Sequence, residues 1–505
     1  MSRPSKADTP ANRELQRQET KGLADFKAKF DPTYEHHVAT TVYPGAPIAP
    51  GTQRFILTSA QNATPVIKTF WASLLRCRDY YKAHLSVIPY RYKNPTSRWT
   101  GSQNNAEYWV QEVREYLCNT RRNINKNLVV LGDVKIVPTA RDPLSGFEGF
   151  TGAESSVIGH PNLAFTTVPT PGHLMAKLMT TTGSCTQLNY GDSRAGRNGE
   201  FQHVTGAVLV EVEGDKFWLR HLNANKLGEF IDKDKIFTPS GVYPAPRPEA
   251  LVNGDAHVRK MNWDVDKGVK IIMETLRPKR QIWHDLFDGA TCNPHEDKDY
   301  FVLLAKMKAG KLNVADELNE TVQYVVDRTP EWCQSIIVDS NHDAFLKRWI
   351  EDKNWKQAGL NGGTYLELAK YMWDSTHMSK AGDEIVPSPF KYWVDKFGHP
   401  RIRCLREDES YAVKGIELGM HGHRGPNGAR GSLKNLVKIG VKFVIGHIHG
   451  PGIRFGGYAV GLMAKLRQGY NKGPSNWLHT MCLVHGGLCA GKRQLITIID
   501  GRPWL

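Results

Sequence analysis

The sequence predicts an α/β protein made of two domains that follow a polar tail. With 505 residues, of which 40% are hydrophobic, the chain is long enough for two or three domains with sizeable cores. Strand-like apolar runs alternate with helix-like segments on both sides of residues 239–248, a stretch that carries four prolines. We therefore expect a flexible tail over residues 1–50, an accessory α/β domain over 51–245 and a second α/β domain over 246–505.

The first half of the chain has the pattern of a parallel sheet with covering helices. Predicted strands and helices alternate there, at residues 54–59, 65–82, 85–90, 106–118 and 128–137. Residues 207–222 have the pattern of a hairpin that turns at Glu213, Gly214 and Asp215. The function of this half is not predicted by any motif that we recognise.

The second half has the same alternation, and polar clusters follow five of its predicted strands. Helices are predicted at residues 264–276 and 299–326. The five strands cover residues 250–253, 281–283, 336–338, 415–419 and 441–445, and a further apolar strand is predicted at 495–499. Open α/β sheets place their ligand sites at the carboxyl ends of such strands, so we expect the clusters to meet there.

The charge of the chain indicates an anionic partner. The formal net charge is +15 and the isoelectric point is near 9.3, which is typical of proteins that bind nucleic acid but also of some that do not. The eight cysteines form no Cys-x-x-Cys pair and predict reduced, buried thiols in a cytosol-like compartment. Neither a signal peptide nor a membrane-spanning apolar run is predicted.

The residues of the five clusters are metal ligands of one chemical kind. They are Asp255 and His257, then Asp285 and Asp288, then Asn341, His342 and Asp343, then His421 and His423, and last His447 and His449. Carboxylate, imidazole and amide oxygen together suit divalent ions such as Mn²⁺, Fe²⁺ or Zn²⁺. No thiol takes part, which argues against a structural zinc site. Each cluster alone is as typical of an ordinary polar turn, and the prediction depends on their number and order.

In this order the clusters resemble the five motifs of the calcineurin-like metallophosphoesterases. The resemblance covers about residues 250–500 and implies a β-sandwich flanked by helices. The spacing from Asp285 to Asn341 requires an insertion, which the helix predicted at 299–326 would supply. Two residues depart from the family pattern, since His284 and Ser340 stand where the family has glycine.

The resemblance also implies a role for each residue. Asp255, His257 and His449 would bind one metal ion, and Asn341, His421 and His447 would bind the second. Asp285 would bridge the two ions, and Asp288 would hold a ligand in place. His342 would protonate the leaving oxygen, with Asp343 orienting its ring. Mn²⁺ is the first expectation for both ions, with Mg²⁺, Fe²⁺ and Zn²⁺ as alternatives.

Five further residues are candidates for contacts to the substrate. Arg424, Arg430 and Lys434 follow the fourth cluster in a glycine-rich loop, where they could bind phosphates or be a solvated charged run. His423 would face the substrate or solvent, and His485 would line the metal cleft or pack in the core. Residues 486–493 approach a phosphate-binding loop, but Arg493 replaces the required Ser or Thr and a strand follows, so no ATP site is expected.

These observations predict a metal-dependent DNase that hydrolyses phosphodiester bonds with two metal ions. The whole chain is similar to the pre-early DNases of T5-like bacteriophages, which degrade host DNA. That resemblance implies a homo-oligomer that binds DNA in the host cytoplasm, without a membrane. The alternatives are a phosphomonoesterase acting on protein or nucleotide with the same metals, and a non-catalytic DNA-binding protein of host takeover.

Overall fold

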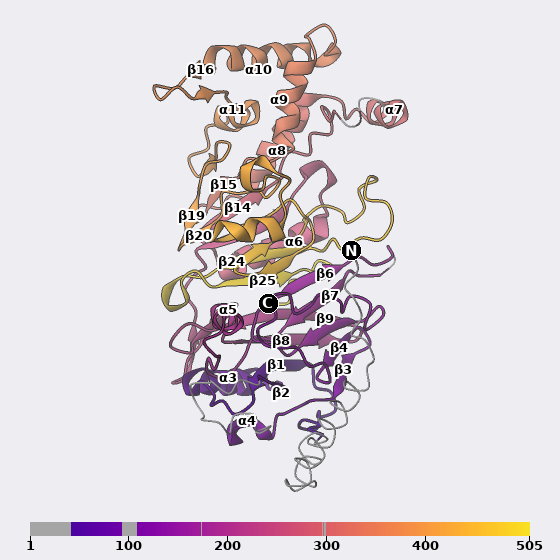
Figure 1. Ribbon diagram of the computed structural model, residues 1–505. Coiled ribbons are helices and arrows are strands. Elements are labelled where there is room, and N and C mark those ends of the chain that lie inside the picture. Colours follow the sequence, from indigo (N-terminus) through magenta and orange to yellow (C-terminus); the bar gives the residue numbers. More distant parts are fainter. Residues whose placement is uncertain (1–41, 93–108, 173, 295, 297–298) are drawn as a thin grey trace, which may run out of the picture.

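The strands that precede the polar clusters lie close together in the computed structural model of the chain (Figure 1). The structure describes residues 42–92, 109–172, 174–294, 296 and 299–505, so most of the predicted tail lies outside the described residues. A six-stranded sheet has the order β18-β15-β14-β13-β24-β25. Its strands are β13 (Ala250–Asp255), β14 (Arg280–His284), β15 (Gln334–Ile337), β18 (Ile402–Cys404), β24 (Thr480–Val484) and β25 (Arg493–Thr497).

The first four of these strands are parallel, and β24 and β25 are antiparallel to their neighbours. Strands β13 and β14 are almost wholly buried, which explains why they are continuous apolar runs rather than alternating ones. Helix α6 (Trp263–Leu276) joins them and buries Val265, Val269 and Ile272 at helical spacing. The predictions for this βαβ unit are confirmed.

A second sheet, with ten strands, is built from both halves of the chain. Its order is β19-β20-β21-β23-β22-β6-β7-β5-β4-β3. From the second half come β19 (Ala412–Val413), β20 (Ile416–Glu417), β21 (Lys442–Ile445), β22 (Gly452–Arg454) and β23 (Gly457–Ala459). From the first half come β3 (Arg121–Asn125), β4 (Leu128–Leu131), β5 (Ser155–Ile158), β6 (Phe165–Val168) and β7 (Lys177–Thr181).

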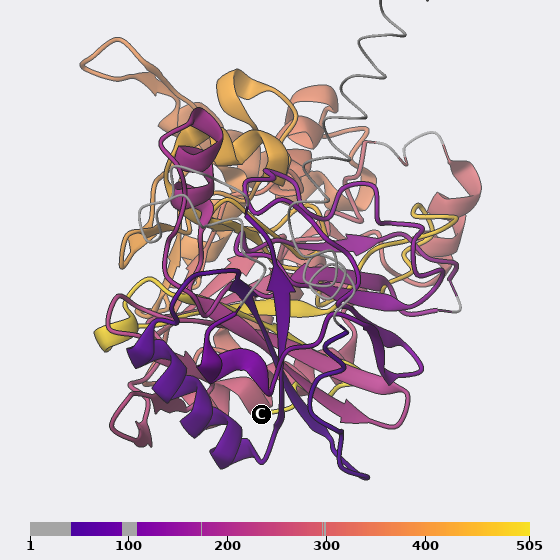
Figure 2. The ribbon, with the colours of Figure 1, turned by 60° about the horizontal axis from the view of Figure 1, so that its bottom comes forward.

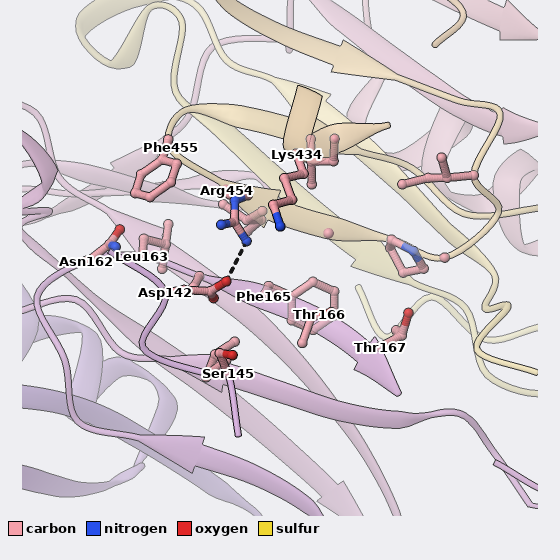
Figure 3. Close-up of a pocket in the computed structure, with 18 of the residues that line it drawn as sticks. Asp142, Ser145, Asn162, Leu163, Phe165, Thr166, Thr167, Lys434, Arg454 and Phe455 are labelled. Carbon is pink, nitrogen blue, oxygen red and sulfur yellow. Dashed lines mark hydrogen bonds and ion pairs between the residues drawn. The ribbon is translucent and has the colours of Figure 1, made fainter. Parts of the chain in front are cut away.

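The two groups of strands meet where Ile453 of β22 pairs with Phe165 of β6. A pocket lined by residues of both halves opens beside this junction (Figure 3). The ten-stranded sheet shares one hydrophobic core with the six-stranded sheet, to which Val252, Ile282 and Val444 belong. The two sheets thus form a sandwich. Its assignment to the metallophosphoesterase fold, and the domain division near residue 245, stay predictions.

The remaining strands of the first half form a four-stranded and a three-stranded sheet. The four-stranded sheet, β2-β1-β8-β9, is mixed rather than purely parallel. The strands are β1 (Arg54–Gln61), β2 (His84–Tyr90), β8 (Gly206–Glu213), β9 (Lys216–Asn223), β10 (Phe230–Asp232), β11 (Lys235–Phe237) and β12 (Val242–Pro244). The β8–β9 pair confirms the predicted hairpin, because antiparallel pairing continues up to the turn at Gly214 and Asp215.

The described residues of the first half include the helices α3 (Lys68–Tyr81), α4 (Gln111–Arg114) and α5 (Arg194–Gln202). Helix α3 is the indigo helix at the lower left of Figure 2. It packs Phe70 and Leu74 against the four-stranded sheet. Of the helix predicted at 106–118, residues 106–108 lie outside the described part. The rest forms only the short α4, because Cys118 instead pairs with Pro44 in a β-bridge.

A group of helices forms the opposite end of the molecule (Figure 1). These are α7 (Tyr300–Lys308), α8 (Val314–Asp327), α9 (Asp343–Asp352), α10 (Gly362–Ser375) and α11 (Pro389–Lys396), with the hairpin β16 (His377–Met378) and β17 (Glu384–Ile385). The single helix predicted over 299–326 is wrong, since it is divided into α7 and α8. Gly310 has φ of +67°, and the Asn313 side chain accepts a hydrogen bond from the Asp316 backbone and so begins a new helix.

The short helices complete the fold. They are α12 (Leu433–Leu436) and the 3-10 turns at Val258–Lys260, Gly359–Asn361, Pro426–Gly428, Val437–Ile439 and Gly487–Cys489. All eight cysteines are buried, as predicted. Among the described residues, no helix has the length and apolar character needed to cross a bilayer.

The two halves are also tied by a buried ionic network around Arg220 of β9. The Arg220 guanidinium lies 2.7 Å from both the Glu211 and the Asp232 carboxylates, and all three side chains are at most 2% exposed. The Gln494 amide of β25 donates to the same Asp232 at 3.0 Å. Strand β25 of the second half is therefore joined to β10 of the first by a network that water does not reach.

Replacing Arg220 with alanine should destabilise the protein by about 3–5 kcal/mol, because two buried carboxylates would lose their countercharge. Urea denaturation measures the effect. The matched control is Lys216→Ala, which removes the exposed ion pair to Asp500 and should cost less than about 1 kcal/mol. Equal effects of the two variants would contradict a structural role of the network.

Candidate metal centre

The seven predicted metal ligands lie together at the carboxyl edge of the sheets. Asp255 is the last residue of β13, and Asp285 directly follows β14. Asn341, His421 and His447 lie in the loops that follow β15, β20 and β21, a few residues after each strand ends. Because these strands run in the same direction within their sheets, their carboxyl ends bring the five loops to one place.

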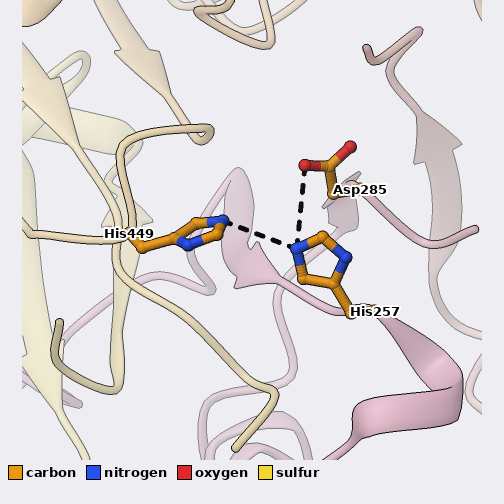
Figure 4. Close-up of side chains that lie close together, drawn as sticks. All are labelled: His257, Asp285 and His449. Carbon is orange, nitrogen blue, oxygen red and sulfur yellow. Dashed lines mark hydrogen bonds and ion pairs between the residues drawn. The ribbon is translucent and has the colours of Figure 1, made fainter. Parts of the chain in front are cut away.

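One group of ligand atoms surrounds the space between Asp255, His257 and His449. The Nε2 atoms of His257 and His449 are 3.4 Å apart, and His449 Nε2 lies 3.0 Å from Asp255 Oδ2. Asp285 Oδ2 approaches His257 Nε2 at 3.8 Å (Figure 4). In Figure 4 the imidazoles and the carboxylate point toward one another from three separate loops. The ligand atoms of His257, Asp285 and His449 lie close enough together to hold one ion, and Asp255 adjoins them through His449.

A second group surrounds Asn341, and it shares Asp285 with the first. Asn341 Oδ1 lies 3.0 Å from His421 Nε2 and 3.1 Å from His447 Nδ1. Asp285 Oδ2 lies 3.2 Å from the same His421 atom. The carboxylate of Asp285 thus adjoins both groups, in the position that a bridging ligand would need. The division of the seven residues into two sets is that implied by the family resemblance.

The burial of the carboxylates fits the presence of cations. Asp255 and Asp285 are at most 2% exposed, and Oδ1 of each makes no hydrogen bond to any described residue. A buried, ionised carboxylate is expensive unless a countercharge or hydrogen-bond donors surround it. Divalent ions held by nitrogen and oxygen atoms would supply that charge, so the donor set fits a pair of such ions.

The backbone around the centre is held in an unusual conformation. His257, Asp285, His447 and His449 all have positive φ, between 42° and 69°. Non-glycine residues adopt this conformation at a cost of about 1–3 kcal/mol each, and they do so mainly at functional sites. At His257, His447 and His449 the turn directs the imidazole into the centre rather than along the loop.

Gly446 provides the space for the Asp255 carboxylate. A Cβ atom at position 446 would overlap Asp255 Oδ1 and would come within 2.9 Å of the His284 side chain. The residue before His447 can therefore only be glycine if Asp255 is to keep its place. This explains the Gly-His-Ile-His sequence of the fifth cluster in steric terms.

The histidines of the centre share its charge unequally. Burial lowers the pKa of His421, but the Asp285 and Asp255 carboxylates raise it more, to about 9. Burial would raise the pKa of Asp285, yet the His421 and His342 imidazoles lower it well below the usual value. His447 is half-buried, and burial together with His421 lowers its pKa to about 4. Without a metal ion, a proton on His421 balances part of the carboxylate charge, and binding a cation there would release it.

His342 lies beside the first group, but its partner differs from the one predicted. Its Nδ1 is 2.7 Å from the Asp288 backbone carbonyl, so Nδ1 donates and Nε2 is left for other contacts. The Asp343 carboxylate instead accepts a hydrogen bond from the Ser340 backbone at 2.9 Å, at the start of α9. The predicted orientation of His342 by Asp343 is therefore wrong, since the backbone of α9 turns that carboxylate toward Ser340.

Asp288 has the supporting position that was expected. Its Oδ1 lies 3.4 Å from His257 Nδ1, on the side of the ring that faces away from His449. Lys260 Nζ lies 3.1 Å from the same oxygen and balances its charge. Such a carboxylate fixes the ring and the tautomer of a metal-binding histidine.

The five predicted substrate contacts are placed in different surroundings. His423 is close to the centre, with its ring 5.5 Å from that of His421. Arg424 already pairs with Glu407 and Asp408, and Arg430 is exposed on the same loop. Lys434 of α12 lines the pocket of Figure 3. His485 does not reach the centre, because it follows Val484, which pairs with Ala250 at the opposite end of β13.

Three residues near the centre, His284, Trp477 and Tyr470, were not predicted as functional. His284 is buried, with Nδ1 at 3.4 Å from His421 Nδ1. Trp477 packs edge-on against His449, with ring centroids 4.3 Å apart, and Tyr470 lies beside Trp477 and Lys260. His284 could have been found from the sequence, because it directly precedes the predicted ligand Asp285. The loop that carries Tyr470 and Trp477 has no motif, and only the fold brings it to the centre.

The chain was compared with known proteins. Protein A1 of Escherichia phage T5 is 31% identical over 470 residues, which cover 89% of this chain and 82% of that protein. No protein-family model matches the chain. No solved structure matches it either, so the metallophosphoesterase resemblance still depends on the motifs and on the geometry of the centre.

Replacing Gly446 with alanine should weaken Mn²⁺ binding about 10–100-fold, since a small-to-large change in a packed site costs about 1–3 kcal/mol. Isothermal titration calorimetry measures the affinity. Gly363→Ala is the matched control, because no atom lies within 4 Å of a Cβ atom there and the site is in α10. Unchanged Mn²⁺ affinity in the Gly446 variant would show that Asp255 is not a ligand.

Proposed function

This chain belongs to the family of Protein A1 of Escherichia phage T5, and from this premise we propose that it is a metal-dependent DNase. In this proposal it hydrolyses DNA phosphodiester bonds with two divalent ions, of which Mn²⁺ is the first candidate. Its relative is a phage protein, which supports a phage origin. The substrate in this proposal is host DNA in the bacterial cytoplasm. The observation that carries the proposal is the position of Asp285 between two groups of ligand atoms.

The chemistry follows from the donor set. Two divalent ions in such a centre would activate a water molecule as the nucleophile and neutralise charge on the phosphoryl oxygens. Asp255, His257, Asp285, Asn341, His421, His447 and His449 would hold the ions in buried positions. His342 would give a proton to the leaving oxygen from Nε2, while the Asp288 carbonyl holds the other side of its ring.

DNA is favoured as the substrate by the surroundings of the centre. The net charge of +15 draws the chain toward polyanions. Lys260 lies over the Tyr470 ring at 5.6 Å, and the Tyr470 and Trp477 rings are 5.8 Å apart. An exposed tyrosine with cations beside it can stack a base and bind a phosphate. A phosphomonoesterase for small substrates would have no use for this arrangement.

The Asp285→Asn variant should lose DNA cleavage by at least about 1,000-fold, because the amide cannot bridge two cations as a carboxylate does. Cleavage of plasmid DNA by the full chain with Mn²⁺ is the assay, with metal content measured by mass spectrometry. Asp327→Asn, on the exposed face of α8, is the control and should keep full activity. A wild-type protein that cleaves only small monoesters would support a phosphatase, and one that binds two ions without turnover would support a non-catalytic role.

Replacing His342 with alanine should lower DNA cleavage about 100–10,000-fold and leave the metal content unchanged, because the ring acts on the leaving group. Hydrolysis of bis(p-nitrophenyl) phosphate should fall much less, since nitrophenolate leaves without a proton. Steady-state rates on both substrates separate the two effects. Loss of bound metal, or an equal fall on both substrates, would contradict the role given to His342.

A further inference from the structure

A pocket of about 290 Å³ lies beside the metal centre, at the junction of the two halves (Figure 3). Its first-half wall comes from β6 and from the segment that includes Arg141, Asp142 and Ser145. Its second-half wall comes from Lys434 of α12 and from the β22 region, including Arg454. Neither half could form this pocket alone.

The pocket adjoins a loop that carries two of the proposed metal ligands. Ile448 and Gly450, the neighbours of His449, both line it. Gly450 packs closely against Thr167 and Asn476, and the Asn476 side chain donates a hydrogen bond to Thr167 Oγ1 at 3.2 Å. Consecutive Cα atoms are about 3.8 Å apart, so a ligand in the pocket would lie within a few ångströms of the His449 backbone. This distance suits a neighbouring unit of a polymer that is bound at the centre.

The charge of the pocket is positive once its ion pairs are counted. Arg454 pairs with Asp142 at 2.9 Å, and Figure 3 shows Lys434 reaching into the same space. Neither Lys434 nor Arg141 forms an ion pair with a carboxylate in the described part of the chain. The remaining acid, Glu148, accepts a hydrogen bond from the Gly146 backbone. The lining therefore holds three cations and two carboxylates, which leaves one positive charge in excess to bind an anion.

An aromatic ring lies between the guanidinium groups. Phe455 has the Arg141 guanidinium 5.6 Å and the Arg454 guanidinium 5.3 Å from its ring centroid. Stacking of this kind orders the long arginine side chains before any ligand arrives, which lowers the entropy cost of binding. The pocket thus combines fixed cations with hydroxyl and amide groups of Ser145, Thr167 and Asn476. Phosphate and sugar oxygens are the groups that such a set recognises.

The geometry points to a subsite for the nucleotides next to the scissile bond. Arg141 and Lys434 would bind backbone phosphates of the strand that leaves the metal centre past His449. This inference rests on the proposed function, and it gives the first half of the chain a part in binding DNA. The contacts would be to the backbone, so the subsite would act on any sequence.

The test is DNA binding by the Arg141→Ala/Lys434→Ala double variant of the full chain. Binding of a fluorescein-labelled single-stranded oligonucleotide is followed by anisotropy in EDTA, where no cleavage occurs. The dissociation constant should rise about tenfold or more, and the slope of log K against log salt should fall in magnitude by about 1.4 for the two lost contacts to a single strand. Hydrolysis of bis(p-nitrophenyl) phosphate with Mn²⁺ should change less than about twofold, because that substrate does not reach the pocket.

Two further variants make the result specific. Arg348→Ala/Lys438→Ala removes the same charge from exposed sites outside the pocket and should bind almost as tightly as the wild type. Arg141→Lys/Lys434→Arg keeps the charge and should stay within about threefold of the wild type. An equal loss in the Arg348/Lys438 control, or no loss in the Arg141/Lys434 alanine variant, would overturn the subsite.

The same experiment separates the subsite from the proposed function. A wild-type protein that binds the oligonucleotide through the pocket but cleaves no DNA with Mn²⁺ would refute the DNase and leave the subsite supported. If the wild type cleaves DNA, and the wild type and the alanine variant bind the oligonucleotide with equal affinity, the subsite alone is refuted. A wild type that binds no oligonucleotide would overturn the subsite.

Discussion

Burial of negative charge at the carboxyl edge of the sheets is the constraint on which the rest of the centre depends. Asp255, Asp285 and Asp288 are all almost inaccessible to water. Carboxylates in such a place need cations or donors close by, or the fold would lose several kcal/mol for each of them. The imidazoles of His257, His421 and His449 are gathered around them. The positive-φ turns at four ligand positions are the conformational cost of this arrangement.

The ten-stranded sheet explains why the two halves of the chain act as one structure. Each half supplies strands to it, and the pairing of β22 with β6 puts the loop that carries His449 against residues of the first half. The buried network of Arg220 and Asp232 and the contact of Gln494 fix the same junction from the other side. The loop that carries His449 therefore contacts the first half, through Gly450 and Thr167.

The sequence predicted the parts of the centre that depend on local pattern. An apolar strand followed by a polar ligand is visible at Asp255, Asp285 and His447, and the parallel order of the strands brings them together. Predictions failed where long-range packing decides. Asp343 follows His342 directly, yet the first turn of α9 directs it to Ser340. His485 looked like a neighbour of the cleft, but the antiparallel direction of β24 places it at the far end of β13.

Some residues that pack around the centre lie on loops that contain no recognisable motif, so the sequence did not indicate that these loops reach the centre. Trp477 and Tyr470 reach His449 and Lys260 only because β23 and β24 bring their loop back across the edge of the sheet. Lys434 could be predicted as a candidate contact from its place after the fourth cluster. Its partners in the pocket, Arg141 and Phe455, could not, because one comes from each half of the chain.

The residues of the centre differ in how far they are exposed to solvent, which shows which side of the candidate centre is open. Asp255 and His257 are fully buried, whereas Asn341, His342 and His447 are only partly buried. The open face of the candidate centre is therefore the side of Asn341 and His447, and His342, beside the first group, is partly exposed as well. A proton donor at that face can reach a leaving oxygen that departs toward solvent, whereas one behind Asp255 could not. The open face also adjoins the loop of His447 and His449, which continues into the pocket shared by the two halves. A long nucleic-acid strand could contact the metal centre and this pocket at the same time, whereas a single small phosphate ester could not.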